Sequence, residues 1–131
     1  TRGTTREIVV RATLESLAYQ TRDVVDAMRR DSGLRLRELR VDGGAAKNNW
    51  LMQFQADLLG MPVARPAMVA NTGKGAGLLA GIQLGWWKPS DLARSERPEK
   101  VFHPRMGEAQ RRRLYDGWLE AVGRVRTRSG Q

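Results

Sequence analysis

The sequence contains no cysteine and only one histidine, His103. Without cysteine the chain can form neither a disulfide framework nor a cysteine-based metal site, and a single histidine argues against the usual zinc sites. The lack of cysteine also fits a cytoplasmic protein. Apolar runs are only a few residues long, whereas a transmembrane helix needs roughly 20 residues. We therefore expect no disulfide, no zinc site and no membrane span.

Aromatic residues are also scarce, at 6% of the chain, while positive charge is plentiful. The formal net charge is +9, with 23 lysines and arginines against 14 acidic residues. Such a balance suits a polyanionic partner, but the charges are spread along the chain without interleaved aromatic residues on which bases could stack. This pattern favours a solvated basic surface, or a basic part of a larger protein, over nucleic-acid binding.

The apolar pattern predicts an α/β fold of few strands and packed helices, in a chain of 131 residues that is about one domain long. Helices are expected over residues 5–30, 47–59, 71–86 and 107–126, and strands over residues 38–41 and 61–65, the second at a sheet edge. Residues 96–103 should form a loop with a short extended piece, and residues 127–131 a loose tail after a domain of residues 1–126. Two short strands cannot bury so many helices, and the chain opens on Thr1 rather than methionine. Both observations predict a part of a longer protein.

Several residues predict the ends and inner faces of these helices. Thr4 and Glu7 match a capping box at the first helix, and Gly33 suits the left-handed position that ends it. The expected inner faces are Val10, Leu14, Leu17, Thr21, Val24 and Met28 in the first helix, Leu51, Phe54, Gln55 and Leu58 in the second, and Leu114, Trp118, Ala121, Val122 and Val125 in the last.

One run carries the strongest functional signal: Val41-Asp42-Gly43-Gly44-Ala45-Ala46-Lys47-Asn48-Asn49-Trp50. A predicted strand ends in an acid and two glycines, and a predicted helix follows directly. Glycine has no Cβ to keep a ligand away from the backbone, and a helix start offers unpaired N–H groups and the positive end of a dipole. Asn48, expected about one turn into the helix, offers a side-chain amide to a base or a ribose. We therefore predict a nucleotide site at Gly43, Gly44 and Asn48.

The carboxylate of Asp42 has two interpretations. It could hold Mg²⁺, directly or through water, or it could orient the glycine turn by hydrogen bonds. The sequence alone favours neither, so Asp42 is a candidate metal residue and a candidate structural residue at the same time.

Other motifs favour plain structural roles. The run Gly73-Lys74-Gly75-Ala76-Gly77 has neither Walker A spacing nor the spacing of a dinucleotide fingerprint, so a packing face of small residues is favoured. His103 occupies a loop position that favours a structural or exposed role over a catalytic one. Trp86-Trp87 favours an aromatic anchor in the core or an interface over a stacking platform. Arg111-Arg112-Arg113 favours a solvated helix face over a phosphate grip.

Two longer stretches are distinctive as whole sequences. The first is Arg11-Ala-Thr-Leu-Glu-Ser-Leu-Ala-Tyr-Gln-Thr-Arg-Asp-Val-Val-Asp-Ala-Met28. The second combines Leu39-Arg-Val-Asp-Gly-Gly-Ala45, Asn48-Asn49 and Leu51-Met-Gln-Phe-Gln-Ala-Asp-Leu-Leu-Gly60. Together they resemble the glycerol kinases, a branch of the FGGY family of carbohydrate kinases. The resemblance runs from Thr1 to about Val125, and other sugar kinases that share the two glycines rarely share the Leu-Met-Gln-Phe-Gln stretch.

The resemblance implies the C-terminal part of the second domain of a kinase with the actin-like, ribonuclease-H-like ATPase fold. It implies ATP and Mg²⁺ as cofactors, with Gly44 and Asn48 as nucleotide contacts, Gly43 as a neighbour and Asp42 as a contributor to the metal. The implied reaction of the intact protein is the ATP-dependent phosphorylation of glycerol to glycerol 3-phosphate. The phosphate-binding segments, the glycerol pocket and the catalytic aspartate would lie upstream of Thr1. We therefore expect no catalytic residue in this chain, no kinase activity from it alone, and at best weak affinity for ATP.

The implied partners are glycerol, contacted upstream of this chain, the N-terminal domain of the same polypeptide, and a second copy of the chain in a homo-oligomer. Neither a membrane nor a nucleic acid is expected as a partner. The family commonly reads Thr-Ala-Leu-Gly-Ala-Ala where this chain has Thr72-Gly-Lys-Gly-Ala-Gly77, which brings the start of the third helix into question. The alternatives are another FGGY kinase of pentulose type, a basic nucleic-acid-binding module without catalysis, and a degenerate relative that binds nucleotide without transferring phosphate.

Overall fold

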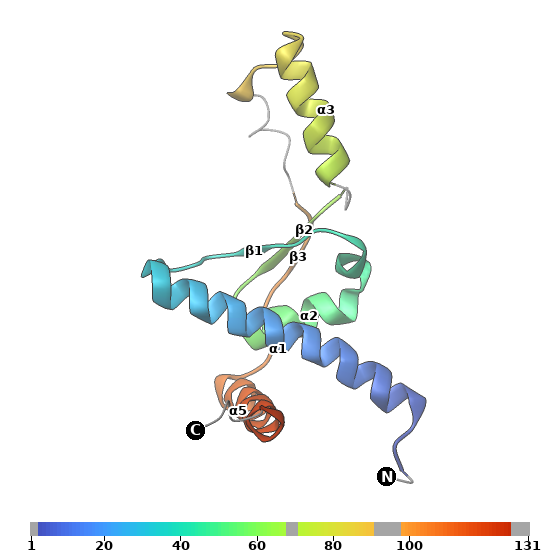
Figure 1. Ribbon diagram of the computed structural model, residues 1–131, viewed down its shortest axis with the longest axis vertical. Coiled ribbons are helices and arrows are strands. Elements are labelled where there is room, and N and C mark those ends of the chain that lie inside the picture. The colour runs from blue at the N-terminus through green and yellow to red at the C-terminus, as the bar shows by residue number, and fades with distance from the viewer. Residues whose placement is uncertain (1–2, 68–70, 91–97, 127–131) are drawn as a thin grey trace.

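The computed structural model describes residues 3–67, 71–90 and 98–126. The α/β fold class is confirmed (Figure 1). In chain order the elements are α1 (Arg6–Ser32), β1 (Leu39–Arg40), the 3₁₀ helix η1 (Gly44–Lys47), α2 (Asn49–Leu59), β2 (Val63–Pro66), α3 (Asn71–Gln83), β3 (Pro98–Phe102) and α5 (Glu108–Val125). The predicted tail, residues 127–131, lies outside the described residues. No helix among the described residues is both long and apolar enough to cross a membrane.

The three strands form one mixed sheet in the order β1-β2-β3. β1 runs parallel to β2, and β2 runs antiparallel to β3, with Val63 opposite Phe102. β2 is therefore the central strand, and the prediction that it lies at a sheet edge is wrong. Pro62 precedes the strand and Pro66 ends it, at the point where the register shifts after Arg65. Because both prolines stand at the ends, their missing N–H groups do not interrupt the ladder.

β3 corrects a second expectation. The sequence predicts a loop with a short extended piece over residues 96–103, whereas residues 98–102 form a strand. The first three residues of β3 are exposed, and only Val101 and Phe102 are partly or fully buried. An apolar pattern this short does not indicate a strand locally, and the pairing with β2 supplies the order.

The start of α1 lies one residue after the predicted cap. Thr5 rather than Thr4 is the N-cap, and its hydroxyl accepts a hydrogen bond from the Ile8 N–H at 3.5 Å. Hydrogen bonds with the backbone and with the Thr5 side chain lower the pKa of the Glu7 carboxyl, so this acid still supports the first turn. Gly33 ends the helix in the left-handed conformation with a φ of 66°, as predicted.

The buried face of α1 differs from the predicted one. Four members of the predicted face are between 42% and 58% exposed: Val10, Leu17, Val24 and Met28. The buried residues of the helix are Ala18, Tyr19 and Val25. α1 is apolar on more than one face, so its own sequence does not decide which face is covered. The position of α2 decides it.

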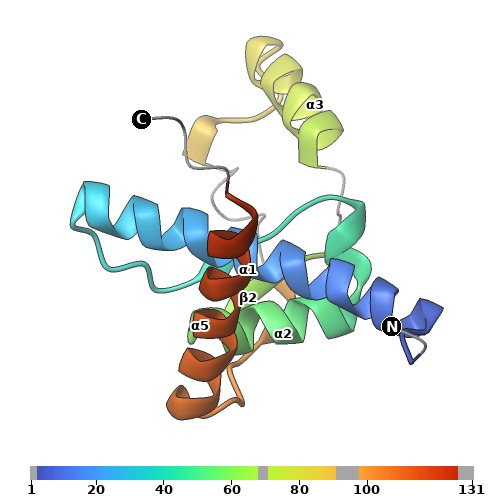
Figure 2. The ribbon, with the colours of Figure 1, turned by 60° about the horizontal axis from the view of Figure 1, so that its bottom comes forward.

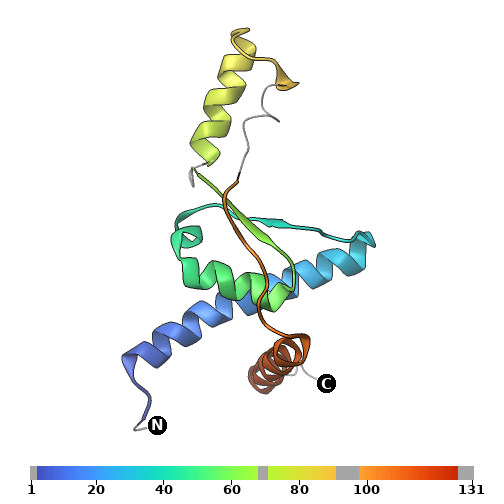
Figure 3. The same cartoon turned by 180° about the vertical axis from the view of Figure 1, so that it is seen from behind.

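The core lies where α2 packs between the sheet and α1. Figure 1 shows α1, α2 and α5 on one side of the sheet, and Figure 3 shows the same arrangement from behind. The predicted inner face of α2 is confirmed, and further residues of the helix are buried as well. The buried residues of α2 are Leu51, Met52, Phe54, Gln55, Ala56, Leu58 and Leu59. A helix buried on most of its circumference is a central element of the core.

α5 crosses α1 and α2 (Figure 2) and is held to α1 by polar and aromatic contacts. Asp23 accepts hydrogen bonds from the Tyr115 hydroxyl at 2.5 Å and the Trp118 indole N–H at 2.9 Å. The Trp118 ring stacks on Tyr19 with 5.3 Å between centroids. Burial, followed by the hydrogen bond and charge of Asp23, raises the pKa of Tyr115 to about 12.

The predicted inward face of α5 is only partly confirmed. Leu114 and Trp118 are partly buried against the core. Ala121 is exposed, and Val125 is 80% exposed. Val122 is also partly buried, so the predicted inward face is wrong only at Ala121 and Val125, which the described residues leave uncovered.

α3 stands apart from the other described elements (Figures 1 and 3). It ends at Gln83 rather than at the predicted Trp86. Lys74 and the glycines beside it lie inside the helix. The departure from the family pattern in this run therefore does not prevent the helix from forming.

The expected packing of the small residues of α3 is present at only one described position. A Cβ added at Gly73, Gly75 or Gly77 would meet no described atom within 4 Å, whereas one at Gly81 would collide with the Trp87 ring. Trp86 is 70% exposed and Trp87 is 42% exposed. Neither tryptophan is in the core, so that part of the expectation is wrong, and Trp87 instead covers the helix that precedes it.

Candidate functional site

The segment between β1 and α2, residues 42–48, is called the glycine turn below. Gly43 has a φ of 88° and a ψ of 177°, and η1 follows it directly. This backbone conformation is essentially restricted to glycine. The Ala46 N–H donates to the Gly43 carbonyl at 3.1 Å, and the Asn48 N–H donates to the Ala45 carbonyl at 3.1 Å. The predicted turn therefore exists, although its helical part is a 3₁₀ turn rather than the start of α2.

The glycine turn is open at both glycines. A Cβ added at Gly43 or Gly44 would meet no described atom within 4 Å, so neighbouring side chains do not plug the bend. Gly44, unlike Gly43, does not have a positive φ. Its backbone would accept a side chain, and the described part of the chain gives no reason why this residue must be glycine.

Asn48 lies elsewhere in the helix than the sequence predicts. It is the N-cap of α2 rather than a residue one turn in, and its Oδ1 accepts a hydrogen bond from the Leu51 N–H at 3.1 Å. The predicted boundary is wrong because η1 occupies residues 44–47 and delays α2. The cap orients the side-chain amide, since Oδ1 must face the helix. The amide nitrogen is the group left to face outward from this exposed residue.

Asp42 takes part in the turn itself. Its Oδ1 accepts a hydrogen bond from the Gly43 N–H at 2.7 Å, which is the orienting role that the sequence left open. The other interpretation, a contribution to a metal site, concerns a single exposed carboxylate. Within residues 3–67, 71–90 and 98–126, no group of three or more histidine, cysteine, aspartate or glutamate side chains is placed to hold a metal ion by itself.

Arg65 is the residue near the glycine turn that sequence reasoning missed. It is only 8% exposed, and its Nη1 donates to the Ala46 carbonyl at 3.0 Å and to Asn49 Oδ1 at 2.9 Å. The one sequence signal is an arginine inside a strand whose other residues are apolar, because such a charge needs partners when it is buried. Which backbone it contacts depends on how β2 packs beside η1.

The glycine turn lies at the carboxyl ends of the parallel strands, a place that commonly binds ligands. β1 and β2 are parallel, so their carboxyl ends lie at the same edge of the sheet. Figures 1 and 3 show the glycine turn and the beginning of α3 following these two ends on the same side of the molecule. Crevices outside the carboxyl ends of parallel strands are the usual ligand sites of open α/β sheets.

Two surface depressions lie away from both glycines. One is lined by residues of α2, β3 and the loop after β3, including Trp50, Lys100 and His103. His103 is exposed, and its backbone carbonyl accepts a hydrogen bond from Gln53 Nε2 at 2.8 Å. This position fits the structural or exposed role that the sequence favours.

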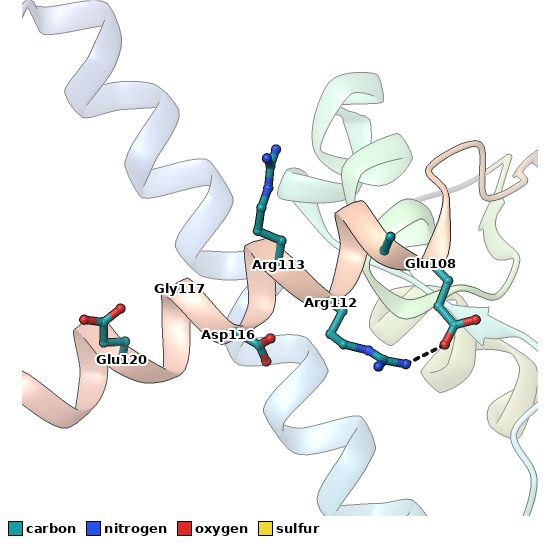
Figure 4. Close-up of a pocket in the computed structure, with 7 residues that line it drawn as sticks. Glu108, Arg112, Arg113, Asp116, Gly117 and Glu120 are labelled. Carbon is teal, nitrogen blue, oxygen red and sulfur yellow. Dashed lines mark hydrogen bonds and ion pairs between the residues drawn. The ribbon is translucent and has the colours of Figure 1, made fainter.

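The other depression lies on α5 alone. Figure 4 shows residues of both charge signs around it, with Arg112 paired to Glu108 at 2.8 Å and Arg113 pointing away on the opposite side of the helix. Arg111 instead donates to the Asp57 carbonyl at 2.7 Å and the Met106 carbonyl at 3.2 Å. The three consecutive arginines therefore do not converge on one point, and the first of them attaches α5 to α2.

Comparison with known proteins places this geometry in a family. The sequence profile of the C-terminal domain of the FGGY family of carbohydrate kinases matches residues 1–84. The chain belongs to this family. It is 57% identical over 124 residues to a glycerol kinase of Halorhodospira halophila, a match that covers 95% of this chain and 24% of that protein. A glycerol kinase of Bacillus subtilis is 57% identical over 123 residues, covering 93% of this chain and 25% of that protein. The chain thus spans about a quarter of the length of these relatives.

Solved structures of FGGY kinases share the fold. A Plasmodium falciparum glycerol kinase, crystallised with ADP, superimposes with a TM-score of 0.83 at 34% identity, over 98% of this chain and 26% of that one. A ligand-bound xylulose kinase from Lactobacillus acidophilus superimposes with a TM-score of 0.78 over 95% of this chain and 26% of that one, at 20% identity. The second likeness shows the fold alone, while the first agrees with the resemblance predicted from the sequence.

Proposed function

We propose that this chain is the C-terminal, nucleotide-binding portion of a glycerol kinase. The intact protein would phosphorylate glycerol with ATP and release ADP and glycerol 3-phosphate in the cytoplasm. One observation carries the proposal: an unobstructed glycine turn at the carboxyl edge of the parallel strands, in a chain that is 57% identical to glycerol kinases. The Plasmodium falciparum relative was crystallised with ADP, which supports a nucleotide as the ligand.

Three residues of the glycine turn would contact the nucleotide. Gly43 and Gly44 leave space for the ligand to approach the backbone. Asn48 would donate hydrogen bonds from its amide nitrogen, because its oxygen is already used by the helix cap. An amide donor suits an acceptor on the adenosine end of ATP, either a ring nitrogen or a ribose oxygen.

Mg²⁺ fits beside the glycine turn only if groups from outside this chain complete its coordination. Magnesium is usually held by one or two carboxylates together with substrate phosphates and water, and Asp42 offers one carboxylate beside the turn. When bound with ATP, the ion neutralises charge on the phosphates. Asp42 would contribute one oxygen or a water-mediated contact while its Oδ1 keeps the Gly43 N–H oriented.

The rest of the kinase would cover surfaces that this chain leaves open. α1 exposes apolar residues along its length, including Ile8, Val9 and Val24 at 51% to 58% exposure, and α3 exposes Leu79 at 68%. Apolar faces on several elements are typical of interfaces rather than of a free surface. We propose that the N-terminal part of a longer polypeptide packs there and supplies the glycerol pocket and the catalytic aspartate. A kinase of pentulose type is the alternative. The part of the polypeptide that binds the substrate would distinguish a glycerol kinase from a pentulose kinase.

A titration of the ¹⁵N-labelled chain with ATP and Mg²⁺, followed by NMR, tests the nucleotide site even when binding is weak. The expected result is a shift of the amide signals of Gly43, Gly44 and Asn48. Two variants separate ligand contact from helix capping. Asn48→Ser keeps a capping oxygen but lacks the amide donor, while Asn48→Ala lacks both. Both should bind ATP more weakly, whereas only Asn48→Ala should lose stability, by about 1 kcal/mol.

A chimera tests the activity. The chain replaces the matching segment of the Halorhodospira halophila glycerol kinase, and glycerol-dependent ADP formation is measured. We expect activity from the chimera and none from the 131-residue chain alone. A folded but inactive chimera, together with unmoved signals in the titration, would reject the proposed function, and activity from the isolated chain would reject the need for the N-terminal part.

A further inference from the structure

Arg65 contacts the backbone of the glycine turn from its inner side. The residue lies in β2, on the same face of the strand as the fully buried Val63. Besides its bonds to the Ala46 carbonyl and Asn49 Oδ1, Nη1 lies 3.4 Å from the Lys47 carbonyl. One buried side chain thus donates hydrogen bonds to the last two residues of η1 and to the first residue of α2.

The burial of this guanidinium shows how much it depends on those contacts. A buried charge is tolerated only when it is paired or hydrogen-bonded. Among the described residues, the ion-pair partner of Arg65 is Glu99, whose carboxylate is 3.7 Å away and half exposed. Phe102 lies beneath, with its ring centroid 5.6 Å from the guanidinium carbon. Within the described part of the chain, the short hydrogen bonds of Arg65 therefore run to the glycine turn and to the start of α2 rather than to an acid.

Hydrogen bonds connect η1 to two of the three proposed nucleotide contacts, Gly43 and Asn48. The Ala46 N–H donates to the Gly43 carbonyl, and the Asn48 N–H donates to the Ala45 carbonyl. A shift of the η1 backbone would therefore disturb Gly43 on one side and Asn48 on the other. Arg65 itself is only 8% exposed, so little of its side chain is accessible to a ligand.

We infer that Arg65 is a positioning residue for nucleotide binding, which holds the glycine turn in the shape that admits ATP. The inference rests on the proposed function, because it concerns the same site. Lysine could not reproduce the arrangement fully, since a single ammonium group lacks the planar fork that reaches several acceptors at once. Methionine would fill similar space but leave the Ala46 carbonyl, in a residue only 2% exposed, without its donor.

Arg111 offers a matched control at the other end of α2. Like Arg65, it is an arginine that donates to backbone carbonyls, those of Asp57 and Met106, although it is partly rather than fully buried. Arg111→Met should therefore cost stability in a comparable way without touching the glycine turn. If Arg65→Met and Arg111→Met differ in hydrogen exchange or in the KM for ATP, the difference comes from the location of Arg65 beside the glycine turn. A general weakening of the fold would affect both variants alike.

Hydrogen exchange in the chain, without nucleotide, tests the first half of the inference. Arg65→Met should speed exchange of the Ala46 and Asn48 amides by about tenfold relative to the other protected amides. Arg111→Met should leave that ratio unchanged. Equal ratios in the two variants would overturn the inference whether or not the chain binds ATP.

The kinetics of the chimera test the second half. Arg65→Met should raise the KM for ATP about tenfold or more, because misplaced binding groups lose their alignment, while the KM for glycerol and kcat change little. Arg65→Lys should fall between the wild type and Arg65→Met, and Arg111→Met should match the wild type. An unchanged KM for ATP in Arg65→Met would refute the positioning role, whereas failure of the unmutated chimera and chain to respond to ATP would refute the proposed function and this role with it.

Discussion

Alanine substitutions at Gly43 and Gly44 should have different consequences, because the two glycines are needed for different reasons. The φ of 88° at Gly43 lies in a region that costs another residue about 1–3 kcal/mol. Gly44 has no positive φ, and a Cβ there would meet no described atom within 4 Å. Gly44→Ala should therefore leave the free energy of unfolding unchanged, or raise it by about 0.4–1 kcal/mol by restricting the unfolded chain.

Gly44→Ala should weaken ATP binding even though it does not lower stability. If ATP approaches the backbone at Gly44, the added methyl group occupies the space of the ligand. We expect affinity to fall about tenfold or more, equivalent to about 1.4 kcal/mol. Gly43→Ala should lower both stability and affinity, because it distorts the turn before any ligand arrives.

Urea denaturation of the chain and the NMR titration with ATP measure the two effects separately. The informative variant is Gly44→Ala, which should unfold at or above the wild-type urea midpoint and still bind less tightly. Wild-type affinity in Gly44→Ala would refute the reasoning that this glycine makes room for a ligand. A Gly43→Ala variant as stable as Gly44→Ala would refute the assignment of strain to the first glycine.

Two further predictions concern the scaffold. Leu58→Ala should lower the free energy of unfolding by about 2–5 kcal/mol, because Leu58 is fully buried. Leu79→Ala, at a position that is 68% exposed, should change it little. Equal losses of stability in the two variants, measured by urea denaturation, would contradict the described core. Tyr115→Phe should remove one hydrogen bond to Asp23 and lower stability by about 1 kcal/mol near neutral pH. The pKa of Tyr115 is raised from 10.0 to about 12, so its contribution is complete below pH 10 and is lost as the pH rises toward 12.

The difference between wild type and Tyr115→Phe measures this pH dependence. Other groups titrate in the same range in both proteins, so their effects cancel in the difference. The stability advantage of the wild type should shrink between pH 10 and pH 12, the range set by the raised pKa. A constant difference across that range would show that burial and the contact with Asp23 do not raise the pKa of Tyr115.

Local signals explain which parts of the fold were predictable. Gly33 and Gly60 both adopt the left-handed conformation at helix ends, since glycine alone pays no steric penalty there. The inner face of α2 was also predictable, because its apolar residues recur at helical spacing and nearly all of them are buried. The glycine turn was predictable for a similar reason, since two consecutive glycines between a strand and a helix require a bend without side chains.

The sequence by itself determined the order of the main elements, the helix ends at glycine and the open bend before α2, because each depends on neighbours a few residues apart. Only the tertiary structure decided the covered face of α1, the central place of β2, the strand at residues 98–102 and the position of Asn48 as a helix cap. It also decided the role of Arg65, whose partners at Ala46 and Asn49 lie 19 and 16 positions away. These features depend on contacts between segments that are far apart in the chain. A local pattern of residue types carries no information about which distant segment a residue will contact.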